Sequence, residues 1–145
     1  GISTLPAIIL DELDRVVEQT ASNTGMVLTL ALSYGGREEI VAMTRNLAEK
    51  VKNGLIHPDH IDASVVNEHL YTADLPDVDL LIRTSGERRI SNFLLWQSAY
   101  AELYFTERFW PDFKEEHLVE ALMDYQNRER RFGKTSEQLE KTPKV

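Results

Sequence analysis

The sequence predicts an α/β fold with a mostly parallel sheet and flanking crossover helices. Two stretches, residues 26–33 and 78–82, are apolar at almost every position, which is typical of strands covered on both faces in a parallel sheet. Segments with the 3.6-residue period of an amphipathic helix precede and follow the first stretch. This alternation of helix and strand is the order that builds parallel sheets.

Composition narrows the classes of protein. At 145 residues with 42% hydrophobic side chains, the chain has the size of one domain that buries its own core. It contains no cysteine, which excludes disulfides and thiolate metal sites, and no apolar run approaches the roughly 20 residues that span a bilayer. A net charge of -8 argues against a nucleic-acid partner. We expect a cytoplasmic protein whose contact with a membrane is at most peripheral, at the inner face.

The first predicted helix begins near Ser3 or Thr4 and is stopped by Asn23-Thr24-Gly25. Ser3 or Thr4 is placed to cap its amino terminus, Pro6 lies in its first turn, and Gly25 follows its end, where glycine tolerates the left-handed backbone. Its apolar side chains fall on one face and predict a helix that packs on the rest of the fold. They are Leu5, Ile9, Leu13, Val16 and Val17.

A second helix follows the strand at 26–33. Its apolar residues keep the helical period over residues 40–51, and Gly54 ends it. The turn between strand and helix contains Gly35 and Gly36. Two interpretations of this pair remain open: it presents free N–H groups to a phosphate, or it only forms a tight strand-to-helix turn.

The loop after this helix contains two histidines, His57 and His60. We do not interpret them as metal ligands, because Pro58 forces a turn and no third nitrogen ligand stands at a useful spacing. Asp62 is placed to cap a short helix over residues 63–70.

Charged and hydroxyl side chains gather where the second apolar strand ends. Residues 83–91 contain three arginines and three hydroxyl side chains against one acidic residue, Glu87. In open α/β sheets ligands bind at the carboxyl ends of strands, and planar guanidinium groups grip phosphate oxygens in pairs. We therefore expect Arg83 and Arg89 to bind a phosphate or diphosphate. The alternative is a structural ion-pair network with Asp79 and Glu87.

Eight of the twelve aromatic residues lie between residues 93 and 113. Core packing explains most of such a cluster, and an apolar protein interface or a wall that faces lipid is the alternative for part of it.

The last predicted helix begins with a capping pair, Asp112 and Glu115, and runs into a basic segment at residues 127–133. The helix dipole alone favours cations at this end, so a structural role is one interpretation of these arginines. Residues 134–145 are polar, lack periodicity and predict a flexible tail. The side chains expected to face inward from the helix are Leu118, Ala121, Leu122 and Tyr125.

Four blocks of the sequence resemble the signature of the cis-prenyltransferases, and most closely that of the bacterial undecaprenyl diphosphate synthases. The blocks stand in the family's order and cover nearly the whole chain, but only the second half of the family's catalytic domain. They are Tyr34-Gly35-Gly36-Arg37, the run from Asp79 to Leu103, Trp110-Pro111-Asp112-Phe113 and Arg130-Arg131-Phe132-Gly133.

The resemblance implies a partial cis-prenyltransferase fold and a prenyl transfer reaction. Isopentenyl diphosphate is condensed with an allylic prenyl diphosphate to give a cis-polyprenyl diphosphate of the undecaprenyl type, a lipid carrier for cell-wall synthesis. The resemblance also implies Mg²⁺ as cofactor and a homodimer built by the carboxy-terminal region.

Roles for particular residues follow from the same resemblance. Arg83, Arg89, Ile90 and Ser91 match the family's binding residues for isopentenyl diphosphate. Glu102 matches a Mg²⁺ ligand, and oxygen ligands suit this ion.

Two further roles concern the ends of the matched region. Arg131 and Gly133 match an element that reaches across the dimer to the neighbouring active site, although family members usually have a second glycine where this chain has Lys134. Met26 matches a residue that limits product length, at the start of a strand that lines an apolar tunnel.

The family's amino-terminal His-x-Met-Asp-Gly-Asn-Gly-Arg block, whose aspartate is the principal catalytic carboxylate, is not in this sequence. The catalytic residue is therefore unknown. We interpret residues 1–133 as the carboxy-terminal part of the catalytic domain and expect it to be inactive alone. Two other functions remain open: a non-catalytic partner subunit of a two-component cis-prenyltransferase, and an unrelated phosphate-binding α/β module.

Overall fold

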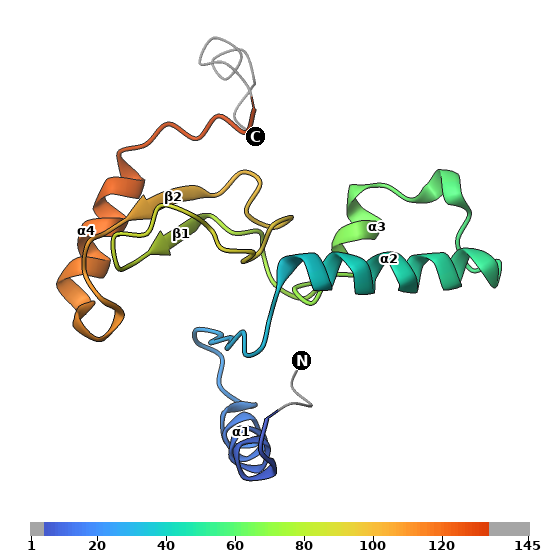
Figure 1. Ribbon diagram of the computed structural model, residues 1–145, viewed down its shortest axis with the longest axis horizontal. Helices are drawn as coiled ribbons and strands as arrows, with labels where there is room; N and C mark the ends of the chain where they lie inside the picture. Colours follow the sequence, from blue (N-terminus) through green and yellow to red (C-terminus); the bar gives the residue numbers. More distant parts are fainter. Residues whose placement is uncertain (1–4, 134–145) are drawn as a thin grey trace.

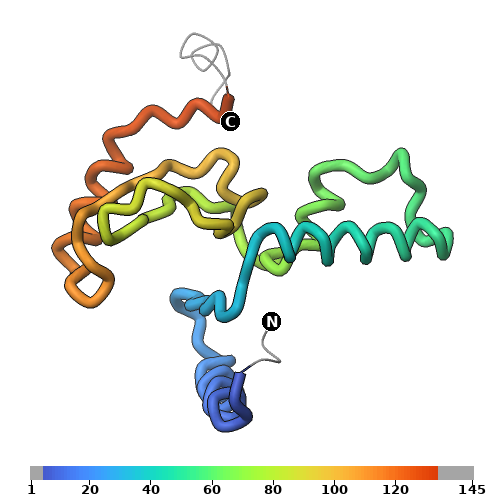
Figure 2. Tube along the Cα trace, viewed as in Figure 1, coloured from blue at the N-terminus to red at the C-terminus, as the bar shows by residue number. Residues whose placement is uncertain are grey.

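The computed structural model describes residues 5–133. Figure 1 shows α4 beside the two strands, α2 and α3 together on the other side of the molecule, and α1 extending away from both groups. In Figure 2 the chain runs from α1 through a long connection before it enters α2. The elements in chain order are α1 (Ala7–Thr20), α2 (Gly36–Lys52), the 3₁₀ turn η2 (Pro58–His60), α3 (Ala63–Asn67), β1 (Leu80–Arg83), β2 (Glu102–Phe105), the 3₁₀ turn η3 (Trp110–Asp112) and α4 (Glu115–Gln126).

β1 and β2 form a two-stranded parallel sheet in which Leu80 lies opposite Glu102 and Arg83 lies opposite Phe105. The predicted α/β class with parallel strands is confirmed. β1 begins two residues later than the predicted strand, at Leu80, and includes Arg83. The connection between the strands, residues 84–101, consists of turns and bends.

A small hydrophobic core lies between α2 and α3. Its buried members are Met43, Leu47 and Leu70, and four partly buried aliphatic side chains pack against them: Ile40 from α2, Ile56 from the loop that follows it, and Val65 and Val66 from α3. Asp62 accepts a hydrogen bond from the Val65 N–H at 3.0 Å, which confirms the predicted cap of α3. α3 itself is shorter than predicted and ends at Asn67.

The predicted strand at residues 26–33 is wrong. The segment has no regular secondary structure, ends in a turn at residues 32–33 and pairs with no strand in the described part of the chain, and its apolar side chains are exposed, Met26 by 90% and Leu28 by 76%. A strand is stabilised by a neighbouring strand and by covering side chains, and an apolar run supplies neither. α1 forms where it was predicted, but the predicted packing of its apolar face on the rest of the fold is wrong for the described residues, because α1 buries none of its side chains.

The predicted cap of the last helix is also wrong. Asp112 lies in η3, and the cap residue of α4 is Lys114, whose N–H donates to Nδ1 of His117 at 3.0 Å. Of the side chains expected to face inward, Ala121 is fully buried, whereas Leu118 remains 42% exposed. The predicted cap residues of α1 and the predicted tail at 134–145 lie outside the described residues.

None of the helices in the described part of the chain combines the length and the apolar composition that crossing a membrane requires.

Candidate functional site

The turn that follows β1 is held by the segment that follows β2. The Ser85 N–H donates to the Arg108 carbonyl at 2.7 Å, and the Gly86 N–H donates to the Thr106 carbonyl at 2.9 Å. Gly86 has φ +68, and a Cβ there would lie 2.4 Å from Oε2 of Glu107. Glycine adopts this positive φ without strain, and the two hydrogen bonds fix the end of β1 against the segment that follows β2.

Arg83 stands at this strand end and lines a hollow of about 390 Å³. Its Nε is buried and has no hydrogen-bond partner, and no described carboxylate forms an ion pair with its guanidinium group. A buried N–H without an acceptor costs free energy, so the site favours an incoming anion. The other residues that line the hollow are Val78, Leu80, Leu81, Ile82, Ile90, Phe93 and Leu94.

The remaining predicted binding residues lie around this hollow in different ways. Ile90 lines it together with Arg83, whereas Arg89 and Ser91, its neighbours in sequence, do not. The Arg89 side chain is 68% exposed and pairs with Glu87 at 2.5 Å. An exposed ion pair contributes only about 0–1 kcal/mol, so Arg89 remains available to a ligand.

Only one of the two ion pairs in the alternative interpretation, a network of Arg83 and Arg89 with Asp79 and Glu87, is formed among the described residues. Arg89 does pair with Glu87, but Asp79 pairs with Arg130 at 2.5 Å and not with Arg83. The two predicted site arginines are therefore not both neutralised by carboxylates in the described part of the chain.

The amino terminus of α2 is already occupied. The Gly36 N–H donates to the Asn92 carbonyl at 2.7 Å, and the Arg37 N–H donates to Oδ1 of Asn92 at 2.9 Å. Of the two interpretations of the glycine pair, the structure favours the tight turn, because these N–H groups bind the protein itself.

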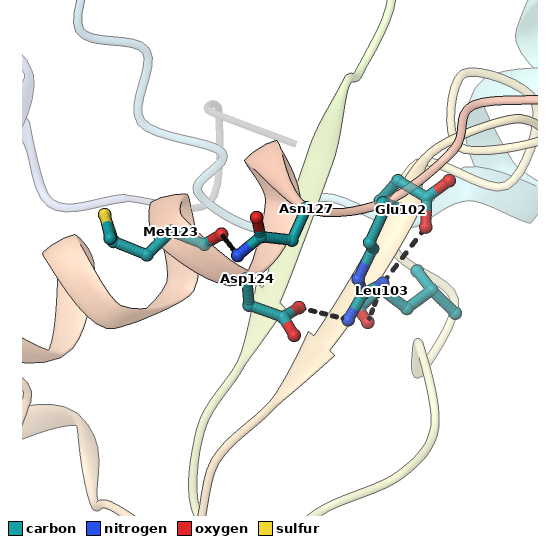
Figure 3. Close-up of polar contacts among 6 residues, drawn as sticks. Glu102, Leu103, Met123, Asp124 and Asn127 are labelled. Atoms are coloured by element: carbon teal, nitrogen blue, oxygen red, sulfur yellow. Dashed lines mark hydrogen bonds and ion pairs between the residues drawn. The ribbon is translucent and has the colours of Figure 1, made fainter.

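Glu102, the predicted metal ligand, begins β2 and lies beside Leu103, across from Asp124 of α4 (Figure 3). Nη1 of Arg128 donates to Oε2 of Glu102 at 3.0 Å and to the Leu103 carbonyl at 2.9 Å, and Nη2 contacts Asp124 at 2.5 Å. The hydrogen bond with Glu102 raises the pKa of the Arg128 guanidinium above its ordinary value. Arg128 therefore joins the end of α4 to the start of β2.

Glu102 has one carboxylate oxygen that Arg128 does not bind, and this oxygen could serve as a Mg²⁺ ligand. No three acidic, histidine or cysteine side chains gather anywhere in residues 5–133, so no complete protein cage exists there. Mg²⁺ usually takes one or two carboxylates and fills its other positions with water and phosphate oxygens. Arg128 binds only one of the two oxygens of Glu102, and a single free carboxylate oxygen suits such an ion.

Arg131 and Gly133 lie at the end of the described chain and do not line the Arg83 hollow. Nε of Arg131 donates to Glu129 at 2.7 Å. A Cβ on Gly133 would lie 3.5 Å from the Tyr100 ring, so this glycine stands next to the aromatic segment before β2.

One buried group was missed in the sequence. Glu39 is 1% exposed, and its carboxylate accepts hydrogen bonds from the Tyr34 hydroxyl at 2.5 Å, the Tyr71 N–H at 2.7 Å and Nε2 of Gln97 at 3.1 Å. Burial, with the Glu39 carboxylate next to it, raises the pKa of the Tyr34 phenol well above its ordinary value. A signal was present, because Glu39 falls four residues before Met43 on the apolar face of α2.

A pair of parallel strands that ends in an arginine without an ion-pair partner among the described residues makes this an α/β protein with a candidate anion site. A family profile described as "Putative undecaprenyl diphosphate synthase" matches residues 1–133, and the chain belongs to this family. The resemblance drawn from the four sequence blocks is confirmed.

The chain is similar to several curated relatives. It is 52% identical over 137 residues to an isoprenyl transferase of Porphyromonas gingivalis, which covers 94% of this chain and 54% of the relative. It is 62% identical over 120 residues to a (2E,6E)-farnesyl-diphosphate-specific ditrans,polycis-undecaprenyl-diphosphate synthase of Vibrio cholerae, covering 83% of this chain and 48% of the relative. The chain thus spans about half the length of the curated relatives it matches.

Two solved structures share the fold. The lavandulyl diphosphate synthase of Lavandula x intermedia, in complex with dimethylallyl diphosphate, matches with a TM-score of 0.88 at 43% identity over 92% of this chain and 58% of that one. A probable undecaprenyl diphosphate synthase from Campylobacter jejuni matches with a TM-score of 0.74 at 33% identity over 92% of this chain and 60% of that one.

Proposed function

We propose that this chain carries the isopentenyl diphosphate site of a cis-prenyltransferase. The whole protein condenses isopentenyl diphosphate with an allylic diphosphate, releases inorganic diphosphate and forms a cis double bond. Repeated condensation gives an undecaprenyl-type diphosphate, the lipid carrier of cell-wall synthesis. Membership of the family and relatives at 52% and 62% identity support this proposal.

The observation that supports the proposal most directly is that the Arg83 side chain has no acceptor for its buried Nε–H. It stands at the carboxyl end of a parallel strand with a buried Nε that has no partner, beside a largely apolar hollow. A diphosphate supplies the missing acceptor, and the five-carbon isoprenoid chain suits apolar walls. Arg89 and the Ser91 hydroxyl, which flank Ile90, add further donors, and the exposed Arg89–Glu87 pair exchanges its carboxylate for phosphate oxygens.

Binding of this kind accelerates the condensation by holding the reacting carbon of the isopentenyl group near the allylic carbon. Arginine donors also compensate the negative charge of the two diphosphates that are brought together. Mg²⁺, when bound, neutralises the departing diphosphate, and Glu102 is the residue of this chain that would hold it.

The carboxy-terminal segment has a second proposed role. In a homodimer, Arg131 and Gly133 of one protomer approach the diphosphate site of its partner, for which Arg131 exchanges its contact with Glu129. We propose residues 1–133 as the carboxy-terminal part of the catalytic domain, inactive without the block that carries the principal aspartate.

Calorimetric titration with isopentenyl diphosphate tests the proposal. The chain should bind it at least tenfold more tightly than inorganic phosphate, and Arg83→Ala should lower the affinity at least tenfold, because the buried donor is lost. Arg45→Ala, which removes an exposed arginine from α2, is the matched control and should leave the affinity within twofold.

Other outcomes of the same experiment favour the other functions. Equal affinity for inorganic phosphate and isopentenyl diphosphate would indicate a general phosphate-binding module. Absence of binding, with capture of a full-length synthase in a pull-down, would indicate a non-catalytic partner subunit. Incorporation of labelled isopentenyl diphosphate into product by the 145-residue chain with farnesyl diphosphate would contradict the proposed inactivity.

A further inference from the structure

Ser91 lies in a strained tight turn. The Phe93 N–H donates to the Ile90 carbonyl at 3.0 Å, and both central residues have left-handed backbone, Ser91 with φ 49 and Asn92 with φ 64. A turn with positive φ at both central positions favours glycine and asparagine, and serine is poorly suited to it. Leu94, two residues after Asn92, also has left-handed backbone, with φ 45. Such a backbone persists only where surrounding contacts hold it.

Asn92 supplies these contacts, and they all reach the first turn of α2. Its carbonyl accepts from the Gly36 N–H at 2.7 Å, its Oδ1 accepts from the Arg37 N–H at 2.9 Å, and its Nδ2 donates to Oε2 of Glu38 at 3.1 Å. The first N–H groups of a helix have no partner inside the helix. The residue before α2 is Gly35, which has no side chain to cap them. Asn92 therefore caps α2 from 55 residues away.

The glycine pair makes this approach possible. A Cβ on Gly36 would lie 2.8 Å from Cγ of Leu95 and 3.1 Å from the Asn92 carbonyl, and a Cβ on Gly35 would lie 2.8 Å from Nδ2 of Asn92. A side chain at Gly36 would meet backbone atoms of Asn92 and Leu95 and would push the segment away from the helix, whereas at Gly35 it would displace the Asn92 amide group.

A second contact fixes the far end of the same segment. Nε2 of Gln97 donates to the buried carboxylate of Glu39 at 3.1 Å, and Glu39 also accepts from the Tyr71 N–H. The first turn of α2 therefore forms hydrogen bonds with this segment at two residues, Asn92 and Gln97. Arg89 and Ser91 precede Asn92, the first of these two residues, in the sequence.

We propose that Asn92 is a positioning residue: by capping α2 it holds Ser91 in left-handed backbone and so sets how Ser91 and Arg89 meet the diphosphate. This inference rests on the proposed function, since it concerns the same anion site. Asn92 acts through its neighbours, and its own side-chain polar atoms are engaged by α2.

Two measurements on the 145-residue chain test the proposal. In Asn92→Ala, amide hydrogen exchange at Arg37 and Phe93 should accelerate at least tenfold, because the cap and the turn are released. In Asn92→Asp, the Arg37 amide should stay protected, since an oxygen acceptor remains. Calorimetric affinity for isopentenyl diphosphate should fall at least tenfold in Asn92→Ala.

The matched control is Asn67→Ala. Asn67 also anchors this segment, accepting a hydrogen bond from Nε1 of Trp96 at 2.7 Å, and this contact falls outside the turn at residues 90–93. Its loss should change the affinity less than threefold at a comparable change in melting temperature. An equal loss of affinity in both variants would reduce Asn92 to a stability role and overturn the proposal.

The remaining outcomes are also decisive. Unchanged exchange at Arg37 in Asn92→Ala, or an affinity within twofold of the unsubstituted chain, would refute the positioning role. If the unsubstituted chain bound no isopentenyl diphosphate, the proposed function would fail and the binding role of Asn92 with it. The exchange data would then still show whether Asn92 holds the turn.

Discussion

Replacing Gly36 with alanine tests the packing on which the candidate site depends. The added methyl group would lie 2.8 Å from Cγ of Leu95, 3.1 Å from the Asn92 carbonyl and 3.2 Å from the Leu95 N–H nitrogen, where ordinary van der Waals contacts begin at 3.4 Å. Two of these three atoms belong to the backbone and cannot rotate away. The turn at residues 90–93 must therefore shift, and the hydrogen bond from the Gly36 N–H to the Asn92 carbonyl weakens.

The magnitude follows from two opposing effects. Overpacking of a well-filled contact costs about 1–3 kcal/mol. Gly36 has no positive φ, so alanine adds no backbone strain, and its better helix propensity returns up to about 1 kcal/mol. We expect a net loss of about 1–2 kcal/mol in the free energy of unfolding. At about 2–4 °C per kcal/mol for a chain of this size, the melting temperature falls by about 2–8 °C.

Urea denaturation with Gly25→Ala as the matched control measures this loss. Nothing lies within 4 Å of a Cβ on Gly25, so alanine there should leave stability unchanged or raise it by about 0.4–1 kcal/mol. Gly36→Ala should also weaken binding of isopentenyl diphosphate, because the turn that carries Ser91 moves. Equal stability of the two alanine variants would refute the claim that Gly36 is needed for close approach.

Two further predictions concern the charged groups of the site. Arg128→Met leaves the half-buried Glu102 carboxylate without its cation. The free energy of unfolding should fall by about 1–3 kcal/mol in urea denaturation. An unchanged denaturation midpoint would contradict this expectation. The raised pKa of Tyr34 means that its contribution to stability is fully present below pH 10.0, the ordinary tyrosine value, and is lost as the pH rises through the raised pKa. In an ultraviolet titration of the five tyrosines, the last to ionise should disappear in Tyr34→Phe.

Contiguous residues were enough to predict the local elements. The helical period and Gly54 predicted α2, Asp62 predicted the start of α3, and the apolar run before Arg83 predicted β1 within two residues. The same reasoning failed at residues 26–33, where the chain has the composition of a strand and forms none. The residue types along a segment set its backbone preference. Whether the segment joins a sheet depends on whether another strand lies next to it in the fold.

The sequence by itself determined the α/β class, the family and the arginine-rich segment after β1, because each depends on residue types in a fixed order along the chain. Only the tertiary structure decided that Asn92 caps α2, that Arg128 holds Glu102 and that Glu39 is buried among three donors. Each of these contacts joins side chains or backbone groups that are distant in sequence. Their partners are selected by packing and by the need to satisfy buried polar groups, and no local pattern records that selection.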